Sequence, residues 1–188
     1  MSEYNSADKE EFIQLIRSVQ REGKISLIEW LESTDFFEAP ASSRHHGAYP
    51  GGLLEHSLNV YRRLGEEMGR ETDSIIIAAL LHDVCKADYY KLSTKNVKNP
   101  KTGEWEKVPF YTIDEQFPYG HGEKSVYLIS KHIQLTNEEA MAIRWHMGAF
   151  DNAVRGGSYS MSGAFEKYKL ALYLHIADMK AAYIDEAR

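Results

Sequence analysis

The apolar segment Ile75–Leu81 constrains the fold of this chain more than any other feature of its sequence. Its residues are apolar on every side of a helix, which is typical of a helix buried all round in a core. Two ionisable residues, His82 and Asp83, follow it directly. A buried charge without compensation is expensive, so this pair needs a specific environment. The sequence therefore predicts a helical core with a polar cluster at the end of its central helix.

Further helices are expected around this segment, in an all-α fold. Apolar residues recur at helical spacing before Gly23 and in a short stretch after it, and a loop broken by prolines and glycines follows. The next helix carries His56 on the same side as its apolar stripe. The predicted helices after the first two cover residues 53–68, 75–81 (with Asp73 or Ser74 as the cap), 122–132, 137–147 and about 163–184, with a glycine-rich link over 148–163. Thr136 and Glu139 are expected to form a capping box at the start of the helix over 137–147.

The length of 188 residues and the hydrophobic content of 43% fit one domain with one core. No repeat or linker divides the chain. We therefore expect a single domain over 1–188, with N-terminal helices over 1–35 and the main helical core over 36–184.

Bulk properties favour a cytoplasmic protein with no membrane partner. The polar, acidic N-terminus is unlike a signal peptide, and the apolar run Ile75–Leu81 is too short to span a bilayer. Cys85 is the sole cysteine, so the chain forms no internal disulfide. The net charge of -6 weighs against general attraction of nucleic acid to the surface. The oligomeric state is not predicted.

A segment around residues 92–119 does not read as helix. A strong turn signal over 99–103 is flanked by apolar and aromatic residues, which predicts a small β-hairpin or ordered loop inserted between helices. Residues 86–112 carry a local charge of +3, so the remaining residues carry -9. Lysines alternating with aromatic residues suit a lid that stacks a base and attracts phosphates. A solvated hairpin with aromatic cross-strand pairs explains them as well.

Candidate metal ligands occur on several of the predicted helices. Histidine nitrogen and aspartate oxygen together suit Mn, Fe, Co, Ni or Zn. Adjacent residues normally point to different sides of a helix, but a bent or frayed helix end can bring both His82 and Asp83 onto one ion. The candidates are His56, His82, Asp83, His121, His146 and Asp178.

Short motifs around these residues match a known family. They are Phe-Glu-Ala-Pro-Ala at 37–41, Tyr-Pro-Gly-Gly-Leu-Leu-Glu-His-Ser at 49–57, Leu-Leu-His-Asp-Val-Cys-Lys at 80–86, Gly-His-Gly at 120–122, Trp-His-Met-Gly at 145–148 and His-Ile-Ala-Asp at 175–178. Over roughly 36–183 the chain resembles the HD superfamily of metal-dependent phosphohydrolases. It looks most like the HD module of bacterial 3′→5′ exoribonucleases, which carry an additional OB-fold that this sequence does not show. It is also similar to HD-type hydrolases of diadenosine polyphosphates.

The resemblance implies a ligand set for one or two divalent transition metals. His56, His82, Asp83 and Asp178 would hold one ion, and Asp83 would bridge to a second ion held by His121 and His146. A bridged pair of metals can generate a hydroxide and neutralise charge on the attacked phosphate. Relatives often have two consecutive histidines where this chain has His146-Met147. The second ion is therefore either weakly held or completed by substrate or water.

Residues outside this ligand set are candidates for substrate binding. Lys86 lies one turn past Asp83, where it would bind the phosphate or assist proton transfer. Arg44 and His46 lie in the loop before the helix of His56, and each either contacts a phosphate or has a plain loop role. His175 is expected to be a core histidine or a partner of a ligand.

The leading functional hypothesis is a phosphohydrolase that uses metal-activated hydroxide. It would cleave a phosphoester or phosphoanhydride bond of a small nucleotide-like substrate or another phosphorylated small molecule, with Asp83 and Lys86 as its catalytic residues. An alternative is a 3′→5′ exonuclease acting on short single-stranded RNA or DNA, which the strongest resemblance favours and the acidic charge balance disfavours. A second alternative is a non-catalytic, metal-dependent nucleotide sensor.

Overall fold

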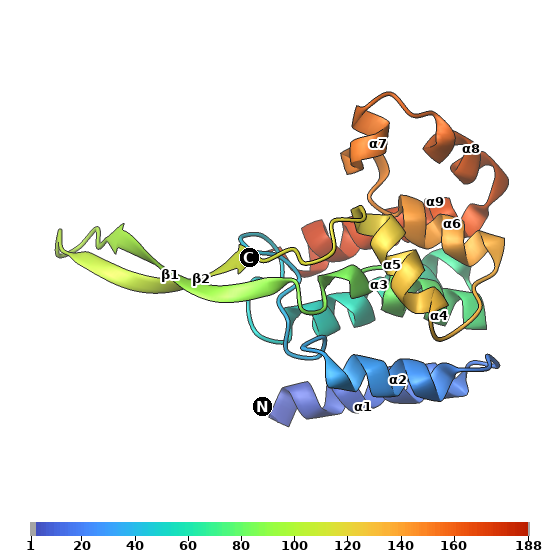
Figure 1. The fold of residues 1–188 in the computed structure, drawn as a ribbon, viewed down its shortest axis with the longest axis horizontal. Coiled ribbons are helices and arrows are strands. Elements are labelled where there is room, and N and C mark those ends of the chain that lie inside the picture. The colour runs from blue at the N-terminus through green and yellow to red at the C-terminus, as the bar shows by residue number, and fades with distance from the viewer. Residues whose placement is uncertain (1–2, 188) are drawn as a thin grey trace.

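The computed structural model describes residues 3–187, so the ends of the predicted domain, residues 1, 2 and 188, lie outside the described residues. The fold is mainly helical with one small insert of two strands, as predicted (Figure 1). The helices before the insert are α1 (Glu3–Ser18), α2 (Lys24–Ser33), α3 (Gly52–Met68) and α4 (Asp73–Leu81). The helices after it are α5 (His121–Ser130), α6 (Asn137–Trp145), α7 (Asn152–Arg155), α8 (Ser160–Lys167) and α9 (Lys169–Lys180).

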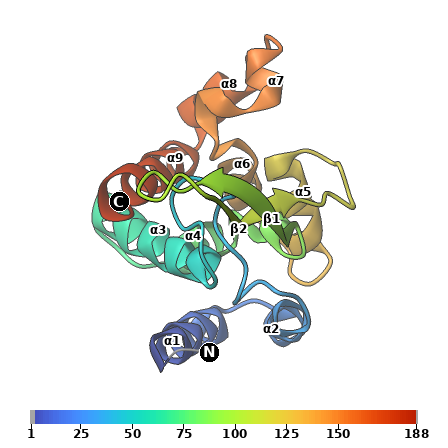
Figure 2. The ribbon, with the colours of Figure 1, turned by 90° about the vertical axis from the view of Figure 1, so that its left-hand side faces the viewer.

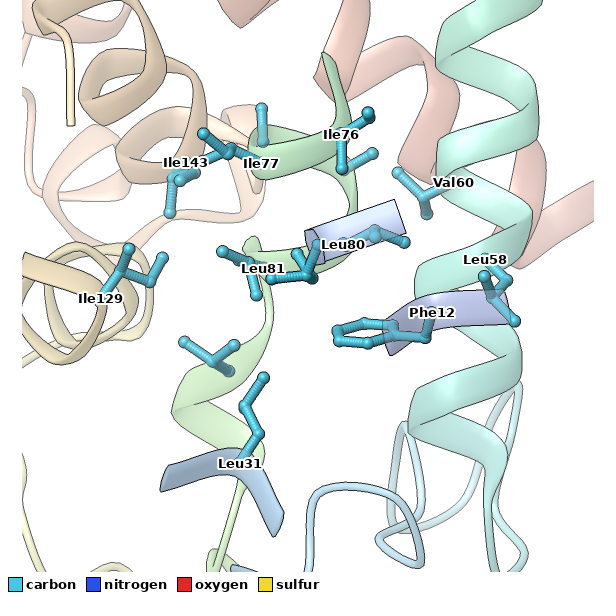
Figure 3. Close-up of a cluster of buried hydrophobic side chains, with 14 of the residues drawn as sticks. Phe12, Leu31, Leu58, Val60, Ile76, Ile77, Leu80, Leu81, Ile129 and Ile143 are labelled. Carbon is cyan, nitrogen blue, oxygen red and sulfur yellow. The ribbon is translucent and has the colours of Figure 1, made fainter. Parts of the chain in front are cut away.

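Helix α4 forms the centre of the core. Each of its residues Ile75–Leu81 is at most 4% exposed, which confirms the prediction of a helix buried all round. Helices α1, α3, α6 and α9 all pack against α4. Figure 3 shows Leu80 and Leu81 of α4 between Phe12 of α1 and Ile143 of α6. Because the core surrounds α4, the residues that follow Leu81 lie inside the bundle.

The chain leaves this core to form an antiparallel ribbon. Strand β1 (Tyr90–Lys98) pairs with β2 (Trp105–Ile113) in a register that runs from Tyr90↔Ile113 to Lys98↔Trp105. The turn between them is closed by Asn99, whose side-chain oxygen accepts hydrogen bonds from the backbone N–H groups of Lys101 and Thr102. The hairpin form of the predicted insert is therefore correct. Figure 1 shows the ribbon extending away from the helices.

The C-terminal helix predicted over about 163–184 is wrong in one respect, because it is broken at Tyr168. Tyr168 has extended backbone angles (φ -123°, ψ 108°) and packs against the core. Helix α9 starts directly after Tyr168. The backbone N–H of Leu170, in the first turn of α9, donates a hydrogen bond to the carboxylate of Glu138. The end of α9 continues as one π-helical turn, Ala181–Asp185.

The start of α6 agrees with the prediction, whereas the link after α6 contains a helix that was not predicted. Helix α6 begins with the predicted capping box, in which Thr136 and Glu139 each bond to the backbone N–H of the other. The glycine-rich link contains the short helix α7, which the sequence did not predict. Within the described residues, none of the helices combines the length and apolar character that a bilayer crossing requires.

Candidate metal centre

The turn after α4 places two neighbouring ionisable residues in one cluster. His82 keeps helical backbone angles (φ -55°, ψ -34°), whereas Asp83 departs from them (φ -108°, ψ 17°). A single 3-10 turn, Val84–Lys86, follows. His82 Nε2 therefore lies 3.4 Å from Asp83 Oδ2, although adjacent residues of a regular helix diverge. The predicted bend at the end of this helix is therefore present.

The remaining predicted ligands come from four further helices and meet Asp83. Oδ1 of Asp83 lies 2.8 Å from Nε2 of His121, the first residue of α5, and 3.5 Å from Nε2 of His146, which follows α6. Oδ2 of Asp83 faces Nε2 of His56 on α3, at 3.8 Å. Asp178 of α9 lies 3.2 Å from His56 Nε2. Asp83 thus has different histidines at each of its two oxygens.

Hydrogen bonds to the far nitrogens orient the imidazole rings. Nδ1 of His82 lies 2.8 Å from the carbonyl of Ala79, and Nδ1 of His146 lies 2.6 Å from the carbonyl of Ile143. A carbonyl only accepts, so both Nδ1 atoms donate, and in the neutral ring the lone pair is on Nε2. Metal-binding histidines use this arrangement to fix their tautomer.

One atom of the cluster is without a hydrogen bond. Among the described residues, His146 Nε2 is the buried side-chain nitrogen that lacks a hydrogen-bond partner. Buried polar atoms are normally satisfied, so an orphan of this kind calls for an ion or another group. Three sets of the predicted ligands have donor atoms within 4.8 Å of one another: His56, His82 and Asp83; His82, His146 and Asp178; Asp83, His121 and His146. These residues fit a divalent metal.

Charge pairing controls the ionisation of the cluster. Burial alone would raise the pKa of Asp83, but Lys86 and the neighbouring histidines hold it well below its usual value. Burial lowers the pKa of His56, and the carboxylates of Asp178 and Glu186 outweigh burial and raise this pKa to about 10. The pKa of Asp178 is lowered, because His56 outweighs the effect of burial there too. Both aspartates are therefore available as anionic ligands at neutral pH.

A cavity of about 380 Å³ opens onto this cluster. Of the predicted substrate-binding residues, Lys86 and His46 line it, and Lys86 Nζ lies 2.6 Å from Asp83 Oδ2. Arg44 is not among its lining residues and instead lines an adjoining hollow, so the geometry gives no support to its predicted role. None of the residues of β1 or β2 lines this cavity, so the role of the ribbon as a lid over the site stays a prediction.

Several lining residues were missed in the sequence. Arg155 of α7 and the aromatic residues Phe150 and Tyr183, which are 47% and 65% exposed, form part of the cavity wall. They lie outside the recognised motifs, and the glycine-rich link gave no signal beyond its length. His175 also lines the cavity, and its Nδ1 bonds to the backbone carbonyl of His146 at 2.6 Å, which fits the expected role of a ligand's partner.

Comparison with known families agrees with this geometry. A model of the HD domain matches residues 53–183, which is well over half of the chain, and the chain belongs to the HD-domain family. No match was found among curated proteins or among solved structures. HD domains bind divalent metals, and membership indicates metal-dependent phosphohydrolase activity in general.

Proposed function

We propose that this protein hydrolyses a phosphoester or phosphoanhydride bond in a small nucleotide-like substrate. The observation that carries the proposal is the convergence of four histidines and Asp178 around the carboxylate of Asp83, at a cavity of about 380 Å³. Cavities of this size are typical of sites for small molecules. The metal ligands would be His56, His82, Asp83, His121, His146 and Asp178, and the metal would be Mn, Fe, Co, Ni or Zn.

The chemistry divides between the metal and the chain. A bound divalent metal lowers the pKa of a water molecule and so supplies the nucleophile. Asp83 remains ionised beside Lys86 and joins the two halves of the ligand set. The ammonium group of Lys86 lies at the cavity wall, where it would bind the phosphate and offset the negative charge that develops during attack.

The outer wall of the cavity suits a nucleotide. Arg155 has no carboxylate partner among the described residues, and its guanidinium lies 5.9 Å from the ring of Phe150. An unpaired arginine can bind a phosphate through two parallel hydrogen bonds. Phe150 and Tyr183 present exposed rings on which a base can stack. Together with Lys86, these groups match the anionic and the planar parts of a nucleotide.

Product analysis by mass spectrometry tests the proposal. The protein is incubated with Mn²⁺ and a panel of nucleoside mono- and triphosphates, cyclic and dinucleoside phosphates, and short RNA and DNA oligomers. We expect cleavage of a small nucleotide and intact oligomers, with turnover abolished by Asp83→Ala in a protein that stays folded. An active Asp83→Ala variant would contradict the mechanism. Tight nucleotide binding without turnover in any of the five metals would favour the non-catalytic sensor.

A second candidate function, single-strand exonuclease activity, has its own supporting observation. A further cavity of about 360 Å³ shares Lys86 and His121 with the metal cavity and is also lined by Tyr89 and Lys124. Tyr89 directly precedes strand β1, so this cavity lies at the base of the lysine-rich ribbon. A strand threaded along this path would meet both stacking rings and cations. Shortening of the oligomers by one nucleotide at a time, with a steep loss of activity in added salt, would favour this function.

A further inference from the structure

Glu186 is a buried carboxylate next to the metal centre that no motif includes. It is 7% exposed and lies just after the π-helical turn at the end of the described chain. Its Oε1 lies 3.0 Å from Nδ1 of His56 and accepts a hydrogen bond of 3.0 Å from the side-chain amide of Asn59. It lies beyond the family match, which ends at residue 183, and beyond the predicted core, which ended at residue 184. Family membership alone therefore does not account for it.

The partners of Glu186 show what compensates its charge. His56 and Asn59 are three residues apart on α3, so one carboxylate reaches both from the same side of the helix. No lysine or arginine forms an ion pair with Glu186 among the described residues. A buried carboxylate is costly unless it is paired. The hydrogen bonds from His56 and Asn59 supply this compensation.

The segment that carries Glu186 lies along α3, and two partly exposed ion pairs join the two elements. Lys180 pairs with Glu67 and Arg63 pairs with Asp185, and in both pairs one residue belongs to α3. The backbone N–H of Glu186 donates to the carbonyl of Ala181 at 3.0 Å, which closes the π-helical turn. In Figure 2 the C-terminal end of the chain lies beside α3 and α9. Turns of this type occur frequently at functional sites.

We propose that Glu186 is a positioning residue that completes the metal centre through His56. By accepting the Nδ1 proton of His56, the carboxylate holds the ring with Nε2 directed at Asp83 and Asp178. It also makes the lone pair of Nε2 more basic and so a stronger metal ligand, as carboxylates behind metal-bound histidines do. This inference rests on the metal binding in the proposed function and is independent of the substrate.

Metal binding to three variants tests this role. Titration of Co²⁺ into metal-free protein gives the dissociation constant, and the visible absorption of the bound ion reports its ligand geometry. Loss of a carboxylate behind a ligand typically weakens metal binding by about 10–100-fold, and we expect this for Glu186→Ala together with an altered spectrum. Glu186→Gln keeps the shape and an accepting oxygen without the charge, so an intermediate affinity is expected.

Asp185→Ala is the matched control. It removes the neighbouring ion pair with Arg63 and leaves the contact to His56 in place, so affinity within about twofold of wild type and an unchanged spectrum are expected. Wild-type affinity in Glu186→Ala, or an equal loss in Asp185→Ala, would overturn the inference. Failure of wild-type protein to bind Co²⁺ would overturn both proposals. Normal Co²⁺ results without turnover of any substrate would overturn the proposed function alone.

Discussion

The helical body and the ribbon of β1 and β2 use similar residues in opposite ways. In the body, Leu80 is fully buried, and the charged groups at the end of its helix are compensated by one another. In the ribbon, Leu92 and Trp105 are 69% and 71% exposed. A two-stranded ribbon alone is marginally stable in water, whereas a core of this kind supplies most of the free energy of folding. The helical body therefore holds the residues of the site in place, whereas the ribbon is an exposed extension of the body.

The ribbon and the helical body also differ in net charge. The ribbon, residues 90–113, carries five lysines and two glutamates, a charge of +3, so the rest of the chain carries -9. Within the body, the carboxylates of Asp83, Asp178 and Glu186 lie at the candidate metal centre. On the ribbon, Lys95 lies over the ring of Phe110, 5.3 Å from its centroid, in the open. If a polyanion binds this protein, the ribbon rather than the body is the region that would attract it.

Truncating one leucine in each region tests the contrast most strongly. Leu80→Ala leaves a cavity in the core, and we expect a loss of about 2–5 kcal/mol in the free energy of unfolding. Leu92→Ala removes an exposed side chain, so a change within about 0.5 kcal/mol is expected. Urea denaturation followed by circular dichroism measures both. A loss above about 2 kcal/mol in Leu92→Ala would mean that the ribbon is buried in solution, for example against another chain.

Metal loading is expected to stabilise the body and leave the ribbon unchanged. A ligand at about 100 times its dissociation constant raises the free energy of unfolding by about 2.7 kcal/mol. Thermal unfolding with and without Mn²⁺, and after addition of a chelator, measures this change. Hydrogen exchange locates it: amides of α3, α4 and α9 should become more protected, and those of β1 and β2 should not. Equal protection of the ribbon would contradict the separation of the two regions.

The parts of the fold and site that the sequence predicts are those with local signals. The run Ile75–Leu81 is apolar on every side, and the Thr136–Glu139 capping box spans three residues. The ligand set was predicted from motif resemblance, and the structure places all six side chains in one cluster. The break at Tyr168 escaped prediction, and the carboxylate of Glu138 that accepts from the N–H of Leu170 after this break is 32 positions away in the chain.

The role of Glu186 was missed for the same reason. Its partner His56 is 130 positions earlier in the chain, and an acidic residue near a chain end is ordinary in sequence. Arg155 likewise gains meaning only when α7 places it at the cavity. Local periodicity thus predicts helices and their caps, whereas contacts between distant segments decide which polar residues complete the site.

Replacing one threonine by alanine in each region is expected to give a smaller difference in stability. Helix α6 carries His146 at its C-terminal end. Thr136→Ala removes the side-chain N-cap of this helix, and the lost cap is expected to lower the free energy of unfolding by about 1 kcal/mol. Thr102 accepts a backbone N–H from Glu104 in the exposed turn of the ribbon, at 3.3 Å. Its alanine variant should change stability by less than about 0.5 kcal/mol. Equal losses on urea denaturation would show that the ribbon turn and the body unfold as one unit.

Removing the ribbon should have the smallest effect on the body and the clearest effect on any polyanionic partner. Tyr90 and Ile113 lie directly opposite each other, so Asn-Gly can replace residues 91–112 as a two-residue turn. We expect the affinity for Co²⁺ and the turnover of a small nucleotide to stay within about twofold of wild type, because no ribbon residue lines the metal cavity. Binding of a labelled oligonucleotide, measured by fluorescence anisotropy at two salt concentrations, should be lost if the exonuclease candidate is right. Loss of metal affinity in this variant would instead place the ribbon within the site, since the deletion leaves every proposed ligand and Glu186 in the chain.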